Sequence, residues 1–450
     1  MPTAYTILFL LLILVAAATW IIPAGSYDYV DGVPVAGTYH TVEQNPQGVG
    51  DVLKAAFSGF YDAVDVCIFI LMVGGFLGVV MKTGAVDAGV GNVIRLLGGR
   101  EKWLIPILML LFGLGGTTYG MWEETMAFYP LLIPVFLAAG YDAVVGISVI
   151  LLGAGAGVIA STVNPFATGI AAGFAGVSLG EGIVLRLLEW VAFEAAAIWF
   201  VMAYAAKVKK NPSKSVVGVG AGKIQVSMDQ QVPFTAKRKV IMALFTLTFL
   251  IMVYAVVPFD EMGLSLPALG WWFPELSALF LVAGVVIGLI DRMSEEELVE
   301  TYVAGCADLL GVAFIIGISR GITVLMNDGA ITDTVLHWGE QALSGAGAIS
   351  FTLLVFALYL PLTILIPSSS GLATLSIPIV APLGKFAGVG GDLVVTAFQS
   401  ASGLVNIITP TAAVVMGALA LGHVPYDRWV KYVWKLILWF LLLALAFLVA

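Results

Sequence analysis

Charged residues are scarce in this sequence. Asp, Glu, Lys and Arg make up 11% of the 450 residues, whereas a water-soluble domain averages about 25%. This deficit indicates a chain that is solvated mostly by lipid. The formal net charge of −9 gives no nucleic-acid footprint, because the Lys and Arg residues are scattered through loops and do not gather on one face.

Cysteine and histidine are also rare. The two cysteines, Cys67 and Cys306, both lie in apolar stretches, which argues against a disulfide framework and predicts two small buried hydrophobic side chains. The three histidines, His40, His337 and His423, stand far apart with no ligand residues nearby. We therefore expect no metal site built on these residues and no bound cofactor.

Hydrophobic residues, by contrast, make up 60% of the chain. A hydrocarbon core of about 30 Å requires about 20 apolar residues for each helical crossing. The first apolar stretch is longer than a typical signal-peptide core and has no Lys or Arg before it, so we interpret it as a retained first helix. The sequence thus predicts an all-α polytopic membrane protein, with apolar stretches at residues 5–22, 68–80, 182–206, 240–257, 275–290 and 430–450.

The sequence also contains an internal repeat. Residues 81–86 (Met-Lys-Thr-Gly-Ala-Val) match residues 326–331 (Met-Asn-Asp-Gly-Ala-Ile). At the same offset Pro165 matches Pro410, and the run Glu-Glu-Thr that begins at Glu123 falls on three serines that begin at Ser368. A register shared over this length indicates a duplication.

Loop charges predict that the two copies are inverted. Basic residues gather in alternate loops, whereas the loops at residues 23–51 and 258–274 carry acidic residues and no Lys or Arg. Under the positive-inside rule the basic loops and the N-terminus are cytoplasmic, and the extra span at residues 275–290 reverses the second copy. Inverted repeats are typical of secondary transporters. We divide the chain into repeat 1 (residues 1–206), a cytoplasmic linker (207–238) and repeat 2 (239–450).

Each copy contains a stretch whose apolar pattern is interrupted near its middle. Residues 103–140 are interrupted by a polar, glycine-rich run at 115–125, and residues 348–387 by a similar run at 367–373. Each arm is too short to cross a bilayer alone. We predict two re-entrant helical hairpins, whose irregular tips are tolerated only against protein or a water-filled cavity.

A broken helix is predicted after each hairpin, at residues 141–175 and 393–421. The breaks fall at Asn164-Pro165 and at Thr409-Pro410, where proline removes a backbone donor. Nearby Asn, Ser and Thr side chains can satisfy the freed carbonyls or bind a ligand or cation, and each restarting helix directs its positive end toward the break. The alternative, that small residues here only allow close helix packing, stays open for residues 153–157.

Glu123 and Glu124 are the most informative residues, because ionisable groups at this depth are costly and normally face a functional cavity. Three uses are open: a countercharge for a cationic substrate, a proton carrier, or cation coordination beside Thr125. A structural ion pair with Arg320 is the alternative, although Arg320 could instead hold a substrate carboxylate.

Two other acids, Asp62 and Asp65, fall near the predicted outer end of their span. We expect both to be solvated.

The sequence resembles the YfcC family of the C4-dicarboxylate anaerobic carrier (DcuC-like) group, in the ion transporter superfamily. The resemblance is carried by the loop from Ile22 to Gly48 and by the run Gly-Met-Trp-Glu-Glu-Thr that begins at Gly120. It implies an elevator-type homodimer in a prokaryotic inner membrane. It also implies a basic amino acid antiporter or, more loosely, a C4-dicarboxylate carrier. In sodium-coupled members, tip serines and broken-helix Asn and Thr residues form sodium sites; Glu at the first tip departs from that pattern.

Two buried acids would repel a dianion and attract an ammonium or guanidinium group. We therefore predict a secondary transporter of basic amino acids, with a C4-dicarboxylate carrier and a sodium/proton exchanger as alternatives. A membrane enzyme is disfavoured, since no nucleophile or phosphate loop accompanies the acids. The candidate sodium ligands are Asn164, Ser369, Asn406 and Thr409. The full predicted site comprises Glu123, Glu124, Thr125, Asn164, Thr168, Arg320, Ser368, Ser369, Ser370, Asn406 and Thr409.

Overall fold

The computed structural model describes residues 4–30, 33–86, 88–89, 100–118, 120–178, 180–218, 233–256, 266–271 and 273–449. The regular secondary structure of these residues is helical apart from two short antiparallel ribbons, so the prediction of an all-α fold is confirmed. Strand β1 (Gly25–Ser26) pairs with β4 (His40–Thr41), and β2 (Tyr29–Val30) pairs with β3 (Val33–Pro34).

Twelve helical segments are described between Ala4 and Lys214, the last of them within the linker. They are α1 (Ala4–Ala18), α2 (Val49–Asp62), α3 (Val64–Lys82), η1 (Glu101–Trp103), α5 (Leu104–Thr118), η2 (Glu123–Phe128), α6 (Tyr129–Ala138), α7 (Ala143–Ile159), η3 (Pro165–Gly169), α8 (Ile170–Ala175), α9 (Ile183–Lys210) and η4 (Pro212–Lys214). Of the predicted linker, residues 219–232 lie outside the described part of the chain.

The second half is built from longer helices. They are α10 (Ala236–Val256), α11 (Phe273–Asp291), α12 (Glu295–Asp328), α13 (Thr332–Leu343), α14 (Ala348–Leu365), α15 (Ser369–Phe386), α16 (Gly391–Asn406), α17 (Ala413–Leu421) and α18 (Tyr426–Val449). Among the described helices, five are long and apolar enough to cross a membrane, namely α3, α11, α12, α14 and α18.

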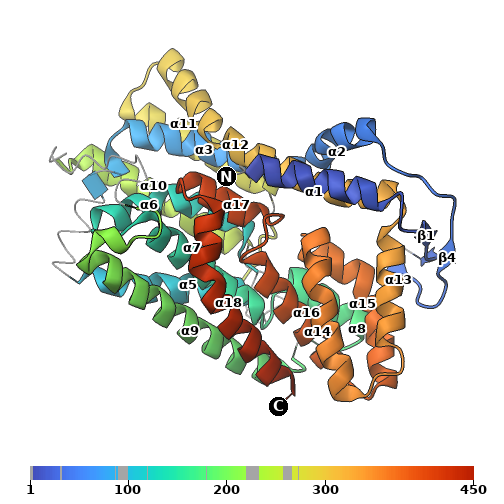
Figure 1. Ribbon diagram of the computed structural model, residues 1–450. Helices are drawn as coiled ribbons and strands as arrows, with labels where there is room; N and C mark the ends of the chain where they lie inside the picture. Colours follow the sequence, from blue (N-terminus) through green and yellow to red (C-terminus); the bar gives the residue numbers. More distant parts are fainter. Residues whose placement is uncertain are drawn as a thin grey trace.

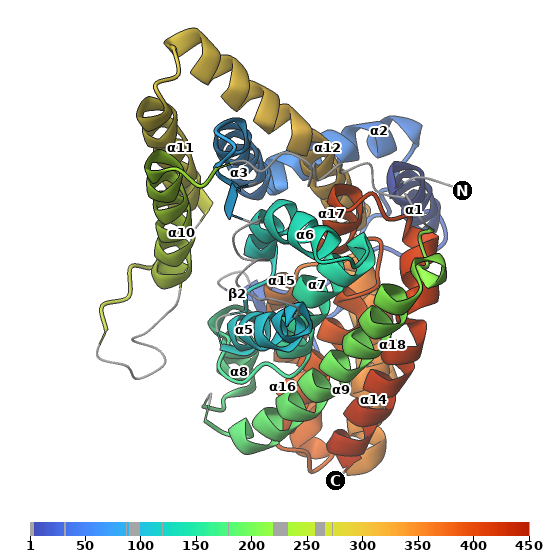
Figure 2. The ribbon, with the colours of Figure 1, turned by 90° about the vertical axis from the view of Figure 1, so that its left-hand side faces the viewer.

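The helices form two groups (Figures 1 and 2). Helices α1, α2, α3, α11 and α12 lie in one layer across one side of the molecule. The second group contains both interrupted hairpins, both broken helices, α9 and α18. We call these the α12 layer and the hairpin body. All the interruptions considered below except the α2–α3 boundary belong to the hairpin body.

Glycines allow α2 and α3 to lie directly against α12. Gly59 meets the backbone of Gly317, and a Cβ added at Gly74 would stand 2.5 Å from the carbonyl oxygen of Gly305. Because the residue number falls along α12 as it rises along α2 and α3, the two run antiparallel. Gly59 and Gly74 therefore both permit a close approach of the helix backbones within the α12 layer.

Cys67 is buried in this contact, as expected, and its Sγ lies 3.5 Å from the Ala313 carbonyl oxygen. The expectation for Cys306 was wrong, because this side chain is half-buried. It lies in the N-terminal half of α12, where exposed residues such as Val299 and Val303 alternate with packed ones.

In the hairpin body α7 crosses α16, also antiparallel. Gly155 packs against the side chain of Ile407, Gly403 packs against the backbone of Ile159, and Gln399 Nε2 donates to the Val158 carbonyl at 2.7 Å. The crossing lies just before the point where each helix ends. It therefore fixes the two breaks relative to each other.

The ribbon-bearing loop after α1 is anchored to α13. Tyr27 Oη donates to Glu340 at 2.7 Å, and Tyr29 Oη donates to Asp333 at 2.7 Å. Burial, and then these carboxylates, raise the pKa of both phenols, so the phenols stay protonated and the bonds persist at physiological pH. The loop thereby ties the end of α1 to the helix that precedes the second hairpin.

We expect Gly74→Ala to destabilise the protein, although alanine favours the helix by about 1 kcal/mol over glycine. The added methyl overlaps the Gly305 backbone, and overpacking of this kind costs about 1–3 kcal/mol. Gly173→Ala in α8 is the control, because nothing lies within 4 Å of its Cβ position. Thermal unfolding in detergent should show a lower melting temperature for Gly74→Ala alone; equal melting temperatures would contradict the packing described.

Candidate functional site

The first hairpin tip is hydrogen-bonded to the first break. Thr117, at the end of α5, donates its hydroxyl to the Ala160 carbonyl at 2.8 Å, and its own carbonyl accepts from the Thr162 hydroxyl at 2.9 Å. The Thr162 N–H also donates to the Thr117 carbonyl at 2.9 Å. All three residues are buried, so the backbone groups released by the break are satisfied by the hairpin.

The predicted residues at this tip are Glu123, Glu124 and Thr125, and the last two form hydrogen bonds with the backbone of the tip. Glu124 is 5% exposed, and its Oε2 accepts from the Trp122 N–H at 3.1 Å. Thr125 is fully buried and donates to the Trp122 carbonyl at 2.5 Å. Glu123 is half-buried. These contacts close the first turn of η2 and leave Glu123 as the more accessible acid.

The predicted residues of the first break lie beside this tip. The Asn164 amide packs against Gly120, whose φ of +77° and lack of a side chain permit the approach. Asn164 Oδ1 also accepts weakly from the Ala167 N–H at 3.4 Å. Thr168 is buried and donates to the Ser161 hydroxyl at 2.8 Å, so its hydroxyl bridges the break.

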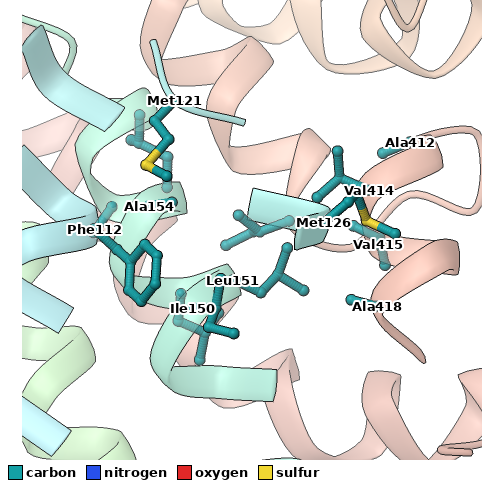
Figure 3. Packing of buried hydrophobic residues seen from close by; sticks show 14 of the residues in the cluster. Phe112, Met121, Met126, Ile150, Leu151, Ala154, Ala412, Val414, Val415 and Ala418 are labelled. Carbon is teal, nitrogen blue, oxygen red and sulfur yellow. The ribbon is translucent and has the colours of Figure 1, made fainter. Parts of the chain in front are cut away.

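The first tip also contacts the second broken helix. The Met126 side chain packs against Gly417 of α17, and Figure 3 shows it beside Val414, Val415 and Ala418. On the other side of the same cluster, Leu151 of α7 faces the tip. The η2 segment thus joins elements from both halves of the chain.

The second tip reaches the first broken helix in a corresponding way. Helix α15, which begins at Ser369, contacts η3 and α8. Ser368 caps α15, since its hydroxyl accepts from the Gly371 N–H at 3.2 Å, and it lies 3.5 Å from the Ser370 hydroxyl. Ser368, Ser369 and Ser370 are all half-buried. Each tip therefore packs on the helix that restarts after the break in the other half.

The second break is held by neighbouring helices. Ser319 of α12 donates to the Thr411 carbonyl at 2.5 Å, and Tyr426 donates to the Ile408 carbonyl at 2.8 Å. The Thr409 hydroxyl lies 2.9 Å from that of Thr411. Asn406 Oδ1 is buried and has no hydrogen-bond partner in the described part of the chain, so this oxygen is available to a ligand.

Arg320 is a residue of α12 and lies beside the boundary between α2 and α3. Its Nε is 3.6 Å from Asp62 Oδ2, and its charge also acts on Glu123, as does that of Asp65. The expectation that Asp62 and Asp65 are simply solvated was wrong in part: Asp62 is exposed but paired, and Asp65 is half-buried. Arg320 therefore forms its ion pair with an acid of the α12 layer, close to the first tip.

The structure does not link all the predicted residues directly. The first tip and first break contain Glu123, Glu124, Thr125 and Asn164, whereas the second break contains Asn406 and Thr409.

Three ionisable residues within the span of α9 were not predicted from the sequence, although charge inside an apolar span was a usable signal. These are Arg186, Glu189 and Glu194, all buried. Among the described residues, no three His, Cys, Asp or Glu side chains gather as a metal site.

A family model described as C4-dicarboxylate anaerobic carrier, DcuC, matches residues 1–450. The chain belongs to the DcuC family. Together with its apolar helices, this makes it a multi-pass membrane protein of a transporter family, and the resemblance found in the sequence is confirmed.

Two curated relatives match almost the entire chain. An uncharacterised protein of Haemophilus influenzae is 35% identical and is aligned over 97% of this chain and 94% of its own length. The putative basic amino acid antiporter YfcC of Escherichia coli is 31% identical, over 96% of this chain and 92% of its own.

Solved structures are more distant. The YdaH transporter of Alcanivorax borkumensis aligns with a TM-score of 0.44 and 14% identity, over 99% of this chain and 98% of its own. MtrF of Neisseria gonorrhoeae aligns with a TM-score of 0.45 and 17% identity, over 100% and 94%.

We expect Thr117→Val to loosen the first tip from the first break. The substitution leaves the buried Ala160 carbonyl without its donor, and an unsatisfied buried group costs about 1–3 kcal/mol. The neighbouring Thr118→Val is the matched control, because in the described part of the chain the Thr118 hydroxyl bonds within its own helix, to the Leu114 carbonyl. Melting temperatures in detergent should fall for Thr117→Val and stay near wild type for Thr118→Val; the reverse order would contradict this geometry.

Proposed function

We propose that this protein is a secondary active transporter that exchanges small basic amino acids across a prokaryotic inner membrane. The observation that carries the proposal is the position of Glu123 and Glu124 at a hairpin tip that touches both broken helices. Acids at such a site select for cations, because burying an unpaired charge is costly. The antiporter description of the YfcC relative supports the same substrate class.

The proposal includes two inverted repeats. Their support is the direction of the crossings, since matched segments of the two halves run antiparallel where they meet: α2 and α3 against α12, and α7 against α16. The reciprocal packing of each tip on the other half's broken helix agrees with this symmetry. Such repeats place substrate between the discontinuous helices of the two halves.

In the proposed site Glu123 binds the cationic end of the substrate. Asp65 adds negative charge on the same side, while Arg320 is engaged by Asp62. The α-ammonium group of the substrate would donate to Asn406 Oδ1, which is buried without a partner in the described residues. The carboxylate end would lie toward the serines at the start of α15, where helix N–H groups and the helix dipole favour an anion. Glu124, Thr125, Thr168 and Thr409 would support the site through the bonds described above. A coupling sodium ion held by Asn164, Ser369, Asn406 and Thr409 stays part of the proposal.

Transport would occur by an elevator movement of the hairpin body against the α12 layer. The division of the helices into two groups suits such a movement. The glycine contacts of α2 and α3 with α12 would make that layer a stiff framework. We further propose a homodimer with a cytoplasmic N-terminus and linker, and no catalytic activity.

A C4-dicarboxylate carrier is the second candidate, favoured by the description of the family model and by the hydroxyl-rich second tip. A dianion would, however, have to approach Glu123, Glu124 and Asp65. A sodium/proton exchanger without an organic substrate is the third candidate, because the same acids can carry protons.

The test is uptake into proteoliposomes. Purified protein is reconstituted and offered labelled arginine, ornithine and succinate side by side, with and without unlabelled arginine inside. We expect arginine and ornithine uptake that rises when arginine is present inside. Uptake of succinate alone would establish the second candidate, and sodium flux without any organic solute the third.

We expect Glu123→Gln to lower the rate of arginine uptake at low concentration by about tenfold to a hundredfold. A hydrogen bond to a charged group contributes about 1.5–3 kcal/mol, and about 1.4 kcal/mol corresponds to tenfold. Glu295→Gln, an exposed acid at the start of α12, is the control. Unchanged arginine uptake in Glu123→Gln would remove Glu123 from the site.

A further inference from the structure

Helix α9 carries ionisable side chains along its buried face. Arg186 and Glu194 are each 2% exposed, and Glu189 is fully buried. Their spacing of three and five residues keeps them on one side of the helix. The opposite side presents Val184, Leu187, Leu188 and Val191, which are exposed. The charged side chains therefore face the interior of the protein, and the exposed side of α9 is apolar. Figure 2 shows α9 packed along the hairpin body beside α18.

Arg186 and Glu189 have partners in the hairpin body. Arg186 Nη2 donates to the Thr162 carbonyl at 3.3 Å, in the first break, and it packs near Asp392 at Gly182. Glu189 Oε1 accepts from the Ser400 hydroxyl at 2.8 Å. Both residues thus have a structural role at the junction of α9, α16 and the first break.

Glu194 differs from both. Its two carboxyl oxygens are buried and have no hydrogen-bond partner in the described part of the chain. The carboxyl group packs against Gly113 of α5, where a Cβ would overlap it. Gly113 lies one turn before Thr117 in α5, so Glu194 contacts α5 about one turn away from the hydrogen bonds that join the first tip to the first break.

Among the residues that the structure describes, no positive charge compensates Glu194. Helices α5 and α7, which pack on α9, contain no ionisable side chain. On α18 the residues at this level are Trp439 and Phe440, of which Phe440 stacks edge-on with Phe193. On α9 itself Glu189 and Arg186 are the nearest ionisable groups, and Glu189 is also an acid. An ionised carboxylate without donors at such a position costs several kcal/mol, whereas the neutral acid costs far less.

We propose that Glu194 is a proton-binding site that couples transport to proton movement. The carboxylate takes one proton from water on one side of the membrane and, as the neutral acid, crosses with the hairpin body. It returns that proton to water on the other side. Helix α5 connects Glu194 to Thr117, so occupancy of the tip and protonation of Glu194 influence each other. The inference deepens the proposed function by adding the proton as a coupling ion beside the proposed sodium ion, and it rests on that function.

The first arm of the test requires no transport. Infrared difference spectra of the purified protein between neutral and alkaline pH report the carbonyl stretch of protonated carboxylic acids. We expect the band of the wild type and of Glu181→Gln, a matched control at an exposed acid, to lose one component in Glu194→Gln. Other buried acids such as Glu189 contribute equally to all three spectra. An unchanged band in Glu194→Gln overturns the proposal. Glu194→Asp keeps a protonatable group and should retain a band, which separates proton loss from misfolding.

The second arm measures coupling in proteoliposomes with labelled arginine. For one coupled proton, an imposed pH difference of one unit shifts accumulation by up to about tenfold. We expect this response in the wild type and Glu181→Gln and its loss in Glu194→Gln, which should still exchange arginine at equal pH. A full response in Glu194→Gln overturns the coupling role. If the wild type moves no arginine, the proposed substrate is wrong, and the infrared band still decides whether Glu194 binds a proton.

Discussion

Backbone groups released where helices are interrupted must find partners without help from bulk water, and the rest of the structure depends on this constraint. Thr117 and Thr162 exchange bonds between the first tip and the first break. Ser368 caps the second tip. Ser319, Tyr426 and Trp429 donate to carbonyls of the second break. The second tip is thus capped within its own helix, and the other interruptions are stabilised by neighbouring elements, which keeps the hairpins and broken helices together as one body.

This constraint divides the polar residues near the interruptions into two sets. Glu124, Thr125, Thr168 and Thr409 are engaged in bonds that hold irregular backbone. Glu123 is half-buried and Asn406 Oδ1 has no partner in the described residues. The proposed recognition of a substrate therefore rests on few groups, and the others give those groups fixed positions. A site of this kind can be specific without a large number of ligand contacts.

The interruptions could be read from the sequence because glycine, proline and short polar side chains interrupt apolar runs at matched offsets. The helical nature of the chain followed from its composition. The boundary at Ala63 between α2 and α3 was not predicted, since no proline or glycine marks it. The partner of Arg320 was missed because the approach of α2 to α12 depends on glycines far apart in sequence. Glu189 and Glu194 were missed because the strong apolar pattern of α9 outweighed single charges.

The fold, the site and the proposed substrate class are connected, because the two halves meet at their interruptions and place an acid there. An experimental structure of the protein with L-arginine bound tests this connection most directly. We expect ligand density at the first tip, with the guanidinium group beside Glu123, the α-ammonium group toward Asn406 Oδ1 and the carboxylate toward the start of α15. Density for arginine only at the surface of the protein, or a dicarboxylate occupying the tip in its place, would contradict it.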